Sequence, residues 1–166
     1  MNYADALDRS RREHPAPWPP GSAEAHSAIE RFRRFFADFT PQKVDALLDQ
    51  TYADNLYFND TLKEIGDRAT LKHYLRESAA AVESCTVVID EVLSNDTGDY
   101  YFRWRMRIRF KRFARGRDTE SIGISHIRFD ANERVVFHQD FWNSTDGLFQ
   151  YVPVLGWMIR KIKQRL

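Results

Sequence analysis

The sequence predicts an α+β fold in which three N-terminal helices pack on a strongly curved antiparallel sheet. Two observations support this prediction. In the first half of the chain, apolar residues recur every three or four positions, which is the spacing of one helix face. From about residue 86 onward they recur every second position, and short turn sequences separate the runs. Helices followed by a meander of strands are typical of the α+β class.

The composition indicates one globular domain. Its 166 residues are 43% hydrophobic and 14% aromatic, which is enough for a buried core. With 25 Lys and Arg against 24 Asp and Glu, the net charge is +1, so a general attraction to nucleic acid is not expected. The single cysteine, Cys85, excludes an intramolecular disulfide and a cysteine-cluster metal site. Because no apolar run could span a bilayer and no secretory leader opens the sequence, we expect a cytoplasmic protein.

Residues 1–21 are predicted to form a proline-rich N-terminal arm. The segment His14–Gly21 holds four prolines and therefore cannot be a helix or a central strand. Trp18 is a candidate anchor for this arm on the domain, and a mobile tail is the alternative.

The first two helices have clear start signals. Ser22 is a suitable N-cap for the first helix, and apolar residues from Ala25 to Phe39 share one of its faces. Thr40-Pro41 ends that helix and begins the second, because Thr caps a helix well and Pro is tolerated at the first helical position.

An extended segment separates these helices from the third. We expect Tyr52–Asp60 to be extended, with Leu56, Phe58 and Asp60 on one side. Gly66-Asp67 then supplies the N-cap of the third helix. The buried face of that helix carries Leu71, Tyr74, Leu75 and Val82.

Four strands follow, over residues 86–94, 99–111, 117–129 and 134–142. The second alternates most clearly, because its even-numbered residues from Tyr100 to Phe110 are apolar. Its odd-numbered positions include Arg103, Arg105, Arg107 and Arg109. The sheet therefore has an apolar face, which should receive the helices, and an arginine-rich face.

The last strand places His138 and Asp140 on one face, together with Val136 and Trp142. Alternate residues on a strand are about 6.8 Å apart, so His138 and Asp140 can contact one ligand or each other. A carboxylate beside an imidazole favours the imidazolium and fixes the tautomer, as a general acid or base requires. The alternative is a buried pair that only holds the strand.

The third strand carries small residues on one face, which would leave space opposite the bulky Trp104 and Met106 and so form a cavity floor. These small residues are Thr119, Ser121, Gly123 and Ser125. In the alternative arrangement the other face points inward, with Asp118, Ile122, Ile124 and His126.

Three motifs follow one another in order over about residues 24–145. They are Tyr52-Ala53-Asp54-Asn55-Leu56-Tyr57-Phe58-Asn59-Asp60, then Gly66-Asp67-Arg68-Ala69-Thr70-Leu71, then Ile127-Arg128-Phe129-Asp130 with Val135-Val136-Phe137-His138-Gln139-Asp140-Phe141-Trp142. In this order they resemble the NTF2-like superfamily, in its SnoaL-like and ketosteroid-isomerase-like branch. The resemblance implies a cone of three helices against a curved antiparallel sheet, with a pocket between them, over residues 22–148.

The resemblance also implies roles for particular residues. Asp60 falls where the isomerase branch keeps its proton-shuttling Asp, and Phe36 and Ser125 fall at its two oxyanion-donor positions. Phe36 cannot donate a hydrogen bond. His138, Asp140 and Trp142 fall on pocket-lining positions of the last strand. The residues expected to bind a ligand are Tyr57, Trp104, Ser125, Trp142 and Phe36. No metal or other cofactor is expected.

The remaining surface features suggest contacts with other molecules. Cross-strand ion pairs with Asp118 and Glu120 explain the arginine stripe better than nucleic acid does. Ile122, Ile124 and His126 are expected on the same convex face, which suits a homodimer interface. Residues 149–166 are predicted to form a basic amphipathic helix, packed on the domain or across a dimer, with a membrane surface or a protein partner as the alternative.

The sequence thus predicts a cofactor-free pocket for a small, apolar, cyclic molecule. An enzyme of this kind would abstract a proton next to a carbonyl group, giving isomerisation, cyclisation or dehydration. Asp60 or Asp140 would be the base, and His138 would orient it or donate a proton. The alternative is a non-catalytic dimeric interaction module that uses the C-terminal helix for a protein partner or a membrane surface.

Overall fold

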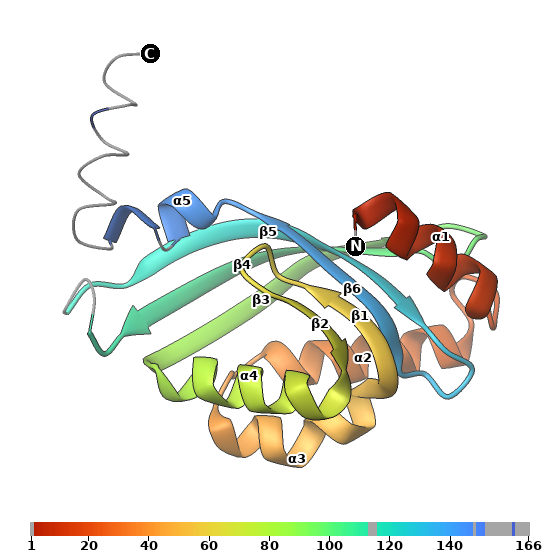
Figure 1. The fold of residues 1–166 in the computed structure, drawn as a ribbon, viewed down its shortest axis with the longest axis horizontal. Helices are drawn as coiled ribbons and strands as arrows, with labels where there is room; N and C mark the ends of the chain where they lie inside the picture. Colours follow the sequence, from red (N-terminus) through yellow and green to blue (C-terminus); the bar gives the residue numbers. More distant parts are fainter. Residues whose placement is uncertain (1, 113–115, 148, 152–160, 162–166) are drawn as a thin grey trace.

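The computed structural model describes residues 2–112, 116–147, 149–151 and 161. These residues form an α+β fold around one six-stranded sheet with the strand order β2-β1-β6-β5-β4-β3 (Figure 1). The strands are β1 (Tyr52–Asn59), β2 (Glu64–Asp67), β3 (Val82–Ser94), β4 (Tyr100–Phe110), β5 (Thr119–Phe129) and β6 (Val135–Trp142). The helices are α1 (Tyr3–Glu13), α2 (Ala23–Phe36), α3 (Pro41–Thr51), α4 (Arg68–Ala80) and the short α5 (Ser144–Gly147), followed by a 3-10 turn η1 (Phe149–Tyr151). Strands β1 and β6 pair in parallel, and the other neighbours are antiparallel.

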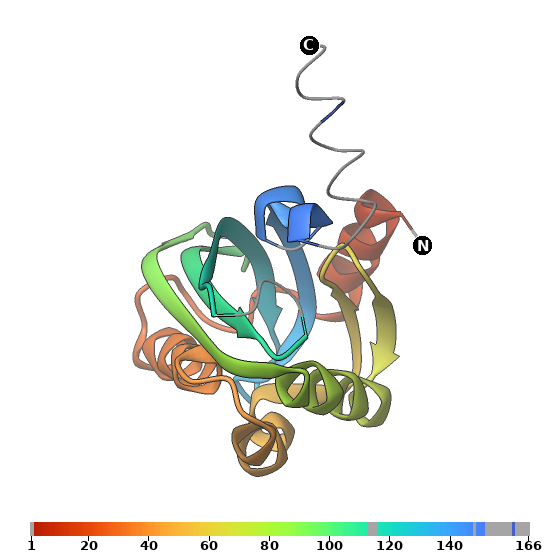
Figure 2. The ribbon, with the colours of Figure 1, turned by 90° about the vertical axis from the view of Figure 1, so that its left-hand side faces the viewer.

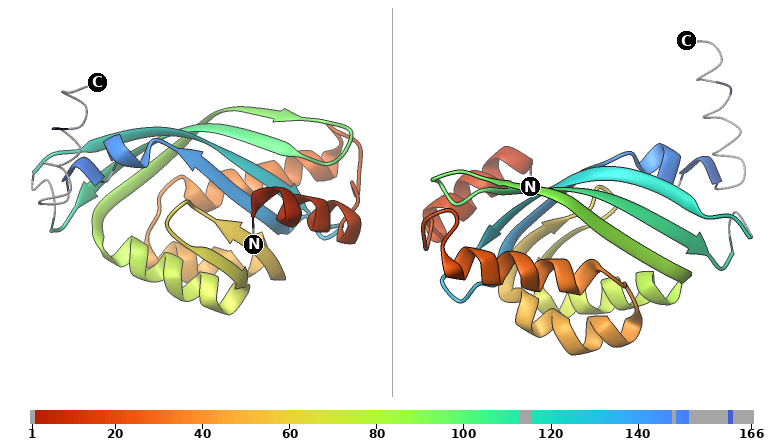
Figure 3. Two further views of the ribbon diagram at one scale, coloured as in Figure 1. Left: turned by 45° about the horizontal axis from the view of Figure 1, so that its top comes forward. Right: turned by 180° about the vertical axis from the view of Figure 1, so that it is seen from behind.

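The sheet is strongly curled, as its side view shows (Figure 2). Helices α2, α3 and α4 lie against its concave face, whereas α1 lies on the other side, across β6 (Figures 1 and 3). Among the described residues, no helix is both long and apolar enough to cross a membrane.

Helices α2, α3 and α4 begin at the predicted caps. The Ser22 hydroxyl accepts a hydrogen bond from the Ala25 N–H, and Thr40 and Asp67 cap α3 and α4 in the same way. Pro41 stands in the first turn of α3, where its missing N–H costs no hydrogen bond. These three helices thus begin where predicted, but α2 ends at Phe36 and α4 at Ala80. Phe39 and Val82 therefore lie beyond the helix faces on which they were expected, and Val82 opens β3.

The alternation of β4 is confirmed as well. Its even-numbered side chains from Tyr100 to Phe110 face inward, with Met106 partly buried and the other five buried. On β5, the small residues Thr119, Ser121 and Ser125 are buried, whereas Ile122 is 66% and Ile124 41% exposed. Of the two arrangements of β5 that the sequence allowed, the structure therefore has the one in which the small residues point toward the helices.

The N-terminal segment differs from its prediction, because residues 3–13 form helix α1. Leu7 and Ala6 pack there against Tyr57 and Phe137 on the outer face of the sheet. Six of its eleven residues are charged and only Tyr3, Ala4, Ala6 and Leu7 are apolar, so the sequence shows little of an apolar stripe. Residues 14–21 are irregular as expected, and Trp18 packs against the main core. The four-residue strand β2 was not predicted either. Of the C-terminal helix predicted over residues 149–166, the structure describes only η1 and Lys161, so this prediction lies outside the described residues.

A buried charge cluster holds α1 in place. The Asp99 carboxylate, with no exposed side-chain surface, accepts hydrogen bonds from Arg128 at 2.5 Å and from Arg11 of α1 at 2.6 Å. The His126 ring lies 3.2 Å from the same carboxylate and contacts the hydroxyl of Tyr3. Burial alone would raise the pKa of Asp99, but His126, Arg11 and Arg128 outweigh it and hold that pKa well below its usual range.

We expect the substitution Asp99→Asn to destabilise the fold by about 3–5 kcal/mol at neutral pH, because it leaves the Arg128 charge buried without its partner. A carboxyl whose pKa is lowered by folding stabilises the protein above its unfolded pKa of about 3.9, and this contribution is lost as the pH falls. Urea unfolding should therefore show a difference between wild type and variant that is largest near pH 7 and shrinks below about pH 4. Asp96→Asn, in the same turn but exposed, is the matched control. An equal difference at all pH values would contradict this account.

Candidate functional site

Two adjoining cavities lie between the concave face of the sheet and the helices. The outer cavity, of about 300 Å³, runs between α4 and strands β3 and β4, and the inner one, of about 70 Å³, reaches toward α2. Phe36, Val87 and Met106 line both cavities. Apolar side chains make up most of both linings, and the burial of Cys85 in the outer wall raises the pKa of its thiol to about 12.

Asp60 stands in the wall of the outer cavity, in the turn between β1 and β2. Its Oδ1 accepts hydrogen bonds from the backbone N–H groups of Leu62 and Lys63, both at 2.9 Å. The indole N–H of Trp142 donates to the Asp60 carbonyl and to the Thr61 hydroxyl, both at 2.8 Å. The carboxylate is therefore held in one orientation by its own turn and by the last strand of the sheet.

Tyr74 of α4 lies beside Asp60 in the same cavity wall. Its hydroxyl donates to Asp60 Oδ2 at 2.5 Å. Burial raises the pKa of Tyr74 strongly, and the neighbouring Asp60 carboxylate raises it further. The tyrosine thus stays protonated at neutral and mildly alkaline pH, as a neutral donor next to a carboxylate.

A chain of hydrogen bonds closes the far end of the inner cavity. The Tyr52 hydroxyl lies 2.8 Å from His138 Nδ1, and His138 Nε2 lies 2.8 Å from Asp140 Oδ1. The Ser125 hydroxyl donates to the same oxygen of Asp140 at 2.5 Å, and the Trp104 indole N–H donates to Ser125 at 2.9 Å. Side chains from β1, β6, β5 and β4 are thus joined in one buried line.

This chain fixes the tautomer of His138. Burial raises the pKa of Tyr52 well above its usual value, and the charge of Asp140 adds to the effect, so the hydroxyl keeps its proton. His138 Nδ1 is the hydrogen-bond partner of this hydroxyl, so we assign the hydroxyl as the donor and place the ring proton on Nε2, where Asp140 accepts it. The ring is only 2% exposed and is surrounded by the edges of Phe32, Phe36 and Phe58, among others.

Only glycine fits at position 123 of β5, next to these hydrogen-bonded side chains, because Trp104 and Trp142 lie too close for a Cβ atom. A Cβ atom at this position would overlap the ring of Trp104 and would lie 2.8 Å from the Cβ of Trp142. Glycine therefore lets two indoles pack against the same stretch of backbone, one in each cavity wall.

The structure brings most of the predicted site residues to these cavities. Asp60 and Trp142 line the outer cavity, Phe36 lines both, and Trp104, Ser125 and His138 line the inner one. The predicted contact between His138 and Asp140 is present, but Asp140 lies behind Ser125 and His138 and lines neither cavity.

Tyr57 was expected in the cavity wall, and the structure corrects this. Its ring stacks on Phe137 on the outer face under α1, and its hydroxyl donates to Gln139. The alternation of β1 is broken, since its register with β6 shifts between Tyr52 and Tyr57. The roles of Tyr74 and Tyr52 were not predicted from the sequence. Tyr74 was assigned to a buried helix face, and no sequence signal places its hydroxyl at Asp60.

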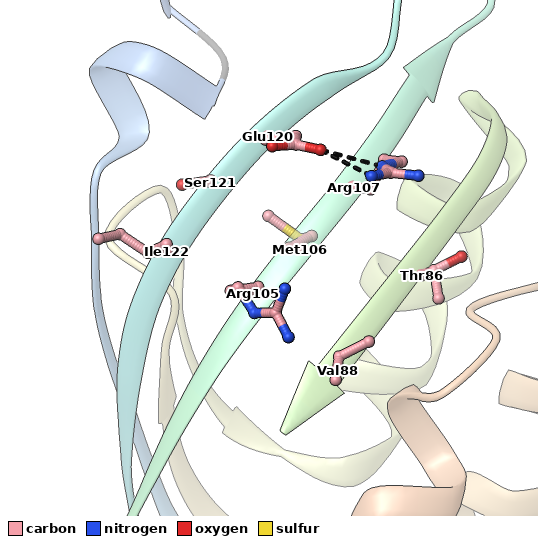
Figure 4. Close-up of a pocket in the computed structure, with 8 residues that line it drawn as sticks. All are labelled: Thr86, Val88, Arg105, Met106, Arg107, Glu120, Ser121 and Ile122. Atoms are coloured by element: carbon pink, nitrogen blue, oxygen red, sulfur yellow. Dashed lines mark hydrogen bonds and ion pairs between the residues drawn. The ribbon is translucent and has the colours of Figure 1, made fainter. Parts of the chain in front are cut away.

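The outer face of the sheet carries the predicted ion pairs. Arg109 binds Asp118, and Arg107 and Glu120 reach toward each other from β4 and β5 (Figure 4). Arg105 binds Asp90 of β3, a pair that was not predicted. A shallow groove of about 270 Å³ lies among these side chains, with Val88 and Ile122 on its walls. Within the described part of the chain, no group of three or more His, Cys, Asp or Glu side chains is placed to hold a metal ion.

Comparison with known proteins places these features in a family. A family model described as the SnoaL-like domain matches residues 32–138, whereas a search of curated proteins found no match. Among solved structures, an LEH-like epoxide hydrolase from M. tuberculosis superimposes with a TM-score of 0.62 at 15% identity, covering 86% of this chain and 99% of the other.

Two further structures are similar in the same way. A proposed polyketide cyclase from Acidithiobacillus ferrooxidans gives a TM-score of 0.64 at 18% identity, covering 79% of this chain and 96% of the other. A Catenulispora acidiphila protein with a ketosteroid isomerase-like fold, solved in complex with trimethylamine, gives 0.64 at 13% identity, covering 84% and 98%. At these identities the likeness shows the fold alone. The family model covers more than half of the chain and confirms the resemblance, so the chain belongs to the SnoaL-like domain family, with an NTF2-like fold.

Proposed function

We propose that the protein binds a small, apolar, cyclic molecule in these cavities and transfers a proton at a carbon next to a carbonyl group, with Asp60 as the base. The observation that supports this most directly is a single, fixed carboxylate in a mostly apolar cavity wall. An apolar wall selects the ligand by burying its surface, and a carboxylate there is positioned to accept a proton from it.

Tyr74 supports the same proposal. Its hydroxyl is a neutral donor in the same wall and stays protonated over the working range of pH. When Asp60 takes up a proton, it loses its negative charge, and its hydrogen bond from the Tyr74 hydroxyl becomes weaker. The hydroxyl can then donate to the oxygen on which negative charge develops.

His138 and Asp140 act as positioning residues in this proposal. Both His138 nitrogens are occupied by Tyr52 and Asp140, which fixes the ring in the floor of the inner cavity. This arrangement favours Asp60 over Asp140 as the base, because only Asp60 lines a cavity. The epoxide hydrolase and the proposed polyketide cyclase with this fold support an enzymatic role in general terms.

The base is tested by proton exchange on a model ketone. In D₂O, wild-type protein should accelerate exchange of the α-protons of 4-isopropylcyclohexanone, followed by proton NMR. Asp60→Asn should lower this acceleration about 100-fold or more, because a general base contributes that much to such a step. Asp38→Asn changes an exposed carboxylate that lines neither cavity and serves as the control. Equal acceleration by wild type and Asp60→Asn would contradict the assignment.

The packing around Gly123 gives a second test. Gly123→Ala should destabilise the protein by about 1–3 kcal/mol and weaken ketone binding, because the new methyl group displaces Trp104 and Trp142. Gly66→Ala is the matched control, since its nearest contact is a carbonyl oxygen at 3.9 Å. Urea unfolding and ligand titration measure both effects. Similar stability losses in the two variants would show that Gly123 is not tightly enclosed.

We also propose self-association through the outer face of the sheet. Four exposed apolar side chains lie there on β3, β5 and β6, and ion pairs neutralise the arginines of β4 between β3 and β5. These apolar residues are Val88, Ile122, Ile124 and Phe141. An apolar and ion-paired face of this kind can pair with its own copy about a two-fold axis.

A charge at the centre of this face should prevent the association. Ile122→Asp should make the protein monomeric in sedimentation velocity, because the carboxylate would be buried without a partner. Leu62→Asp, at a 45% exposed position beside the outer cavity, should leave the oligomeric state unchanged. A monomeric wild-type protein would rule the interface out.

A further inference from the structure

The polar side chains at the far end of the inner cavity have no hydrogen-bond donor left for a ligand. The Trp104 N–H donates to Ser125, and the Ser125 hydroxyl donates to Asp140. In the tautomer assigned above, the proton on His138 Nε2 goes to Asp140, and the Tyr52 hydroxyl donates to His138 Nδ1. The residue types suggest a polar end, but every donor there is already used within the protein.

This position matters because two oxyanion donors are expected there from the family resemblance. Phe36 has no polar group, and the Ser125 proton is held by a carboxylate at 2.5 Å. A ligand carbonyl placed at this end would lose its hydrogen bonds to water and find no replacement. The rest of the inner wall is aromatic or aliphatic, from Phe32, Ile89 and the three residues shared with the outer cavity.

The size of the inner cavity limits what can enter it. Its volume of about 70 Å³ is less than a quarter of the 300 Å³ of the outer cavity. A small branched alkyl group therefore suits this space better than a second ring does. The outer cavity, of about 300 Å³, has room for a ring and carries Asp60 and Tyr74 in its wall.

From these observations, and resting on the proposed function, we propose that the inner cavity is a specificity pocket for a small, branched alkyl end of the ligand. The ligand then lies with its carbonyl group toward Asp60 and Tyr74 and its alkyl end against Trp104, Ser125 and His138. Trp104 and Ser125 determine this orientation, because Ser125 accepts the Trp104 N–H and Asp140 accepts the Ser125 hydroxyl proton, which leaves neither donor to the cavity.

Two ketones of nearly equal shape test the proposal. In 4-isopropylcyclohexanone the end opposite the carbonyl is alkyl, whereas in 4-acetylcyclohexanone an oxygen replaces one methyl group. Whichever way the acetyl compound lies, one carbonyl must enter the inner cavity. Isothermal titration should show that wild-type protein binds the isopropyl compound about 10- to 100-fold more tightly, which is the range expected when an added polar group is left unpaired.

Substitution of Ser125 tests the physical reason for this preference. Ser125→Ala frees the Trp104 N–H, which can then donate to the acetyl oxygen, so the preference should fall to a few-fold. Ser121→Ala is the matched control, since Ser121 is buried on the same face of β5 but donates to Asn143 and lines neither cavity. It should keep the wild-type preference.

The outcomes separate this proposal from the proposed function. Equal binding of the two ketones by wild type, or an unchanged preference in a folded Ser125→Ala variant, would overturn the specificity pocket alone. Failure of the wild type to bind either ketone would overturn both proposals. If Ser125→Ala does not fold, intermolecular NOEs in the wild-type complex decide. We expect contacts from the isopropyl methyl protons to the Trp104 indole, and contacts to Tyr74 instead would overturn the orientation.

Discussion

The line of hydrogen bonds from Tyr52 through His138, Asp140 and Ser125 to Trp104 is the constraint on which the site depends. It joins four strands at the place where the sheet curls over the helices, in a mostly buried region. Polar groups buried in this way are costly unless every one of them is paired. Because they are paired with each other, the end of the cavity is rigid and offers a ligand an almost apolar surface.

The reactive part of the site lies at the other end. Asp60 belongs to a tight turn, and its carboxylate is held by two backbone N–H groups, by Tyr74, and indirectly by the hydrogen bonds of Trp142. The last strand therefore positions both ends of the site, since β6 carries His138 and Asp140 at the closed end and Trp142 at the open end. The fold thus separates the two ends of the site. At the closed end the polar groups are paired with one another, and at the open end a carboxylate and a hydroxyl donor, Asp60 and Tyr74, face the cavity.

Much of this arrangement could be predicted from the sequence. The helix caps at Ser22, Thr40 and Asp67 and the alternation of β4 are local signals, and the structure follows them. The contact between His138 and Asp140 follows from the two-residue period of a strand. Pairings between distant segments gave no such signal. Neither the contact of Tyr52 with His138, 86 residues apart, nor the position of Tyr57 beyond an irregularity in β1 could be derived from local spacing.

Helix α1 shows the same limit on the outer face, where a few long-range contacts to Asp99 and His126 fix a helix that its own sequence barely specifies. The tautomer of His138 tests the central claim most directly, because the claim requires every donor at the closed end to be used within the protein. Long-range nitrogen–proton correlation NMR of the histidine rings at pH 8 measures it. We predict a proton on Nε2 and none on Nδ1. A proton on Nδ1, or on both nitrogens, would contradict the account, because Tyr52 could then no longer donate to this ring.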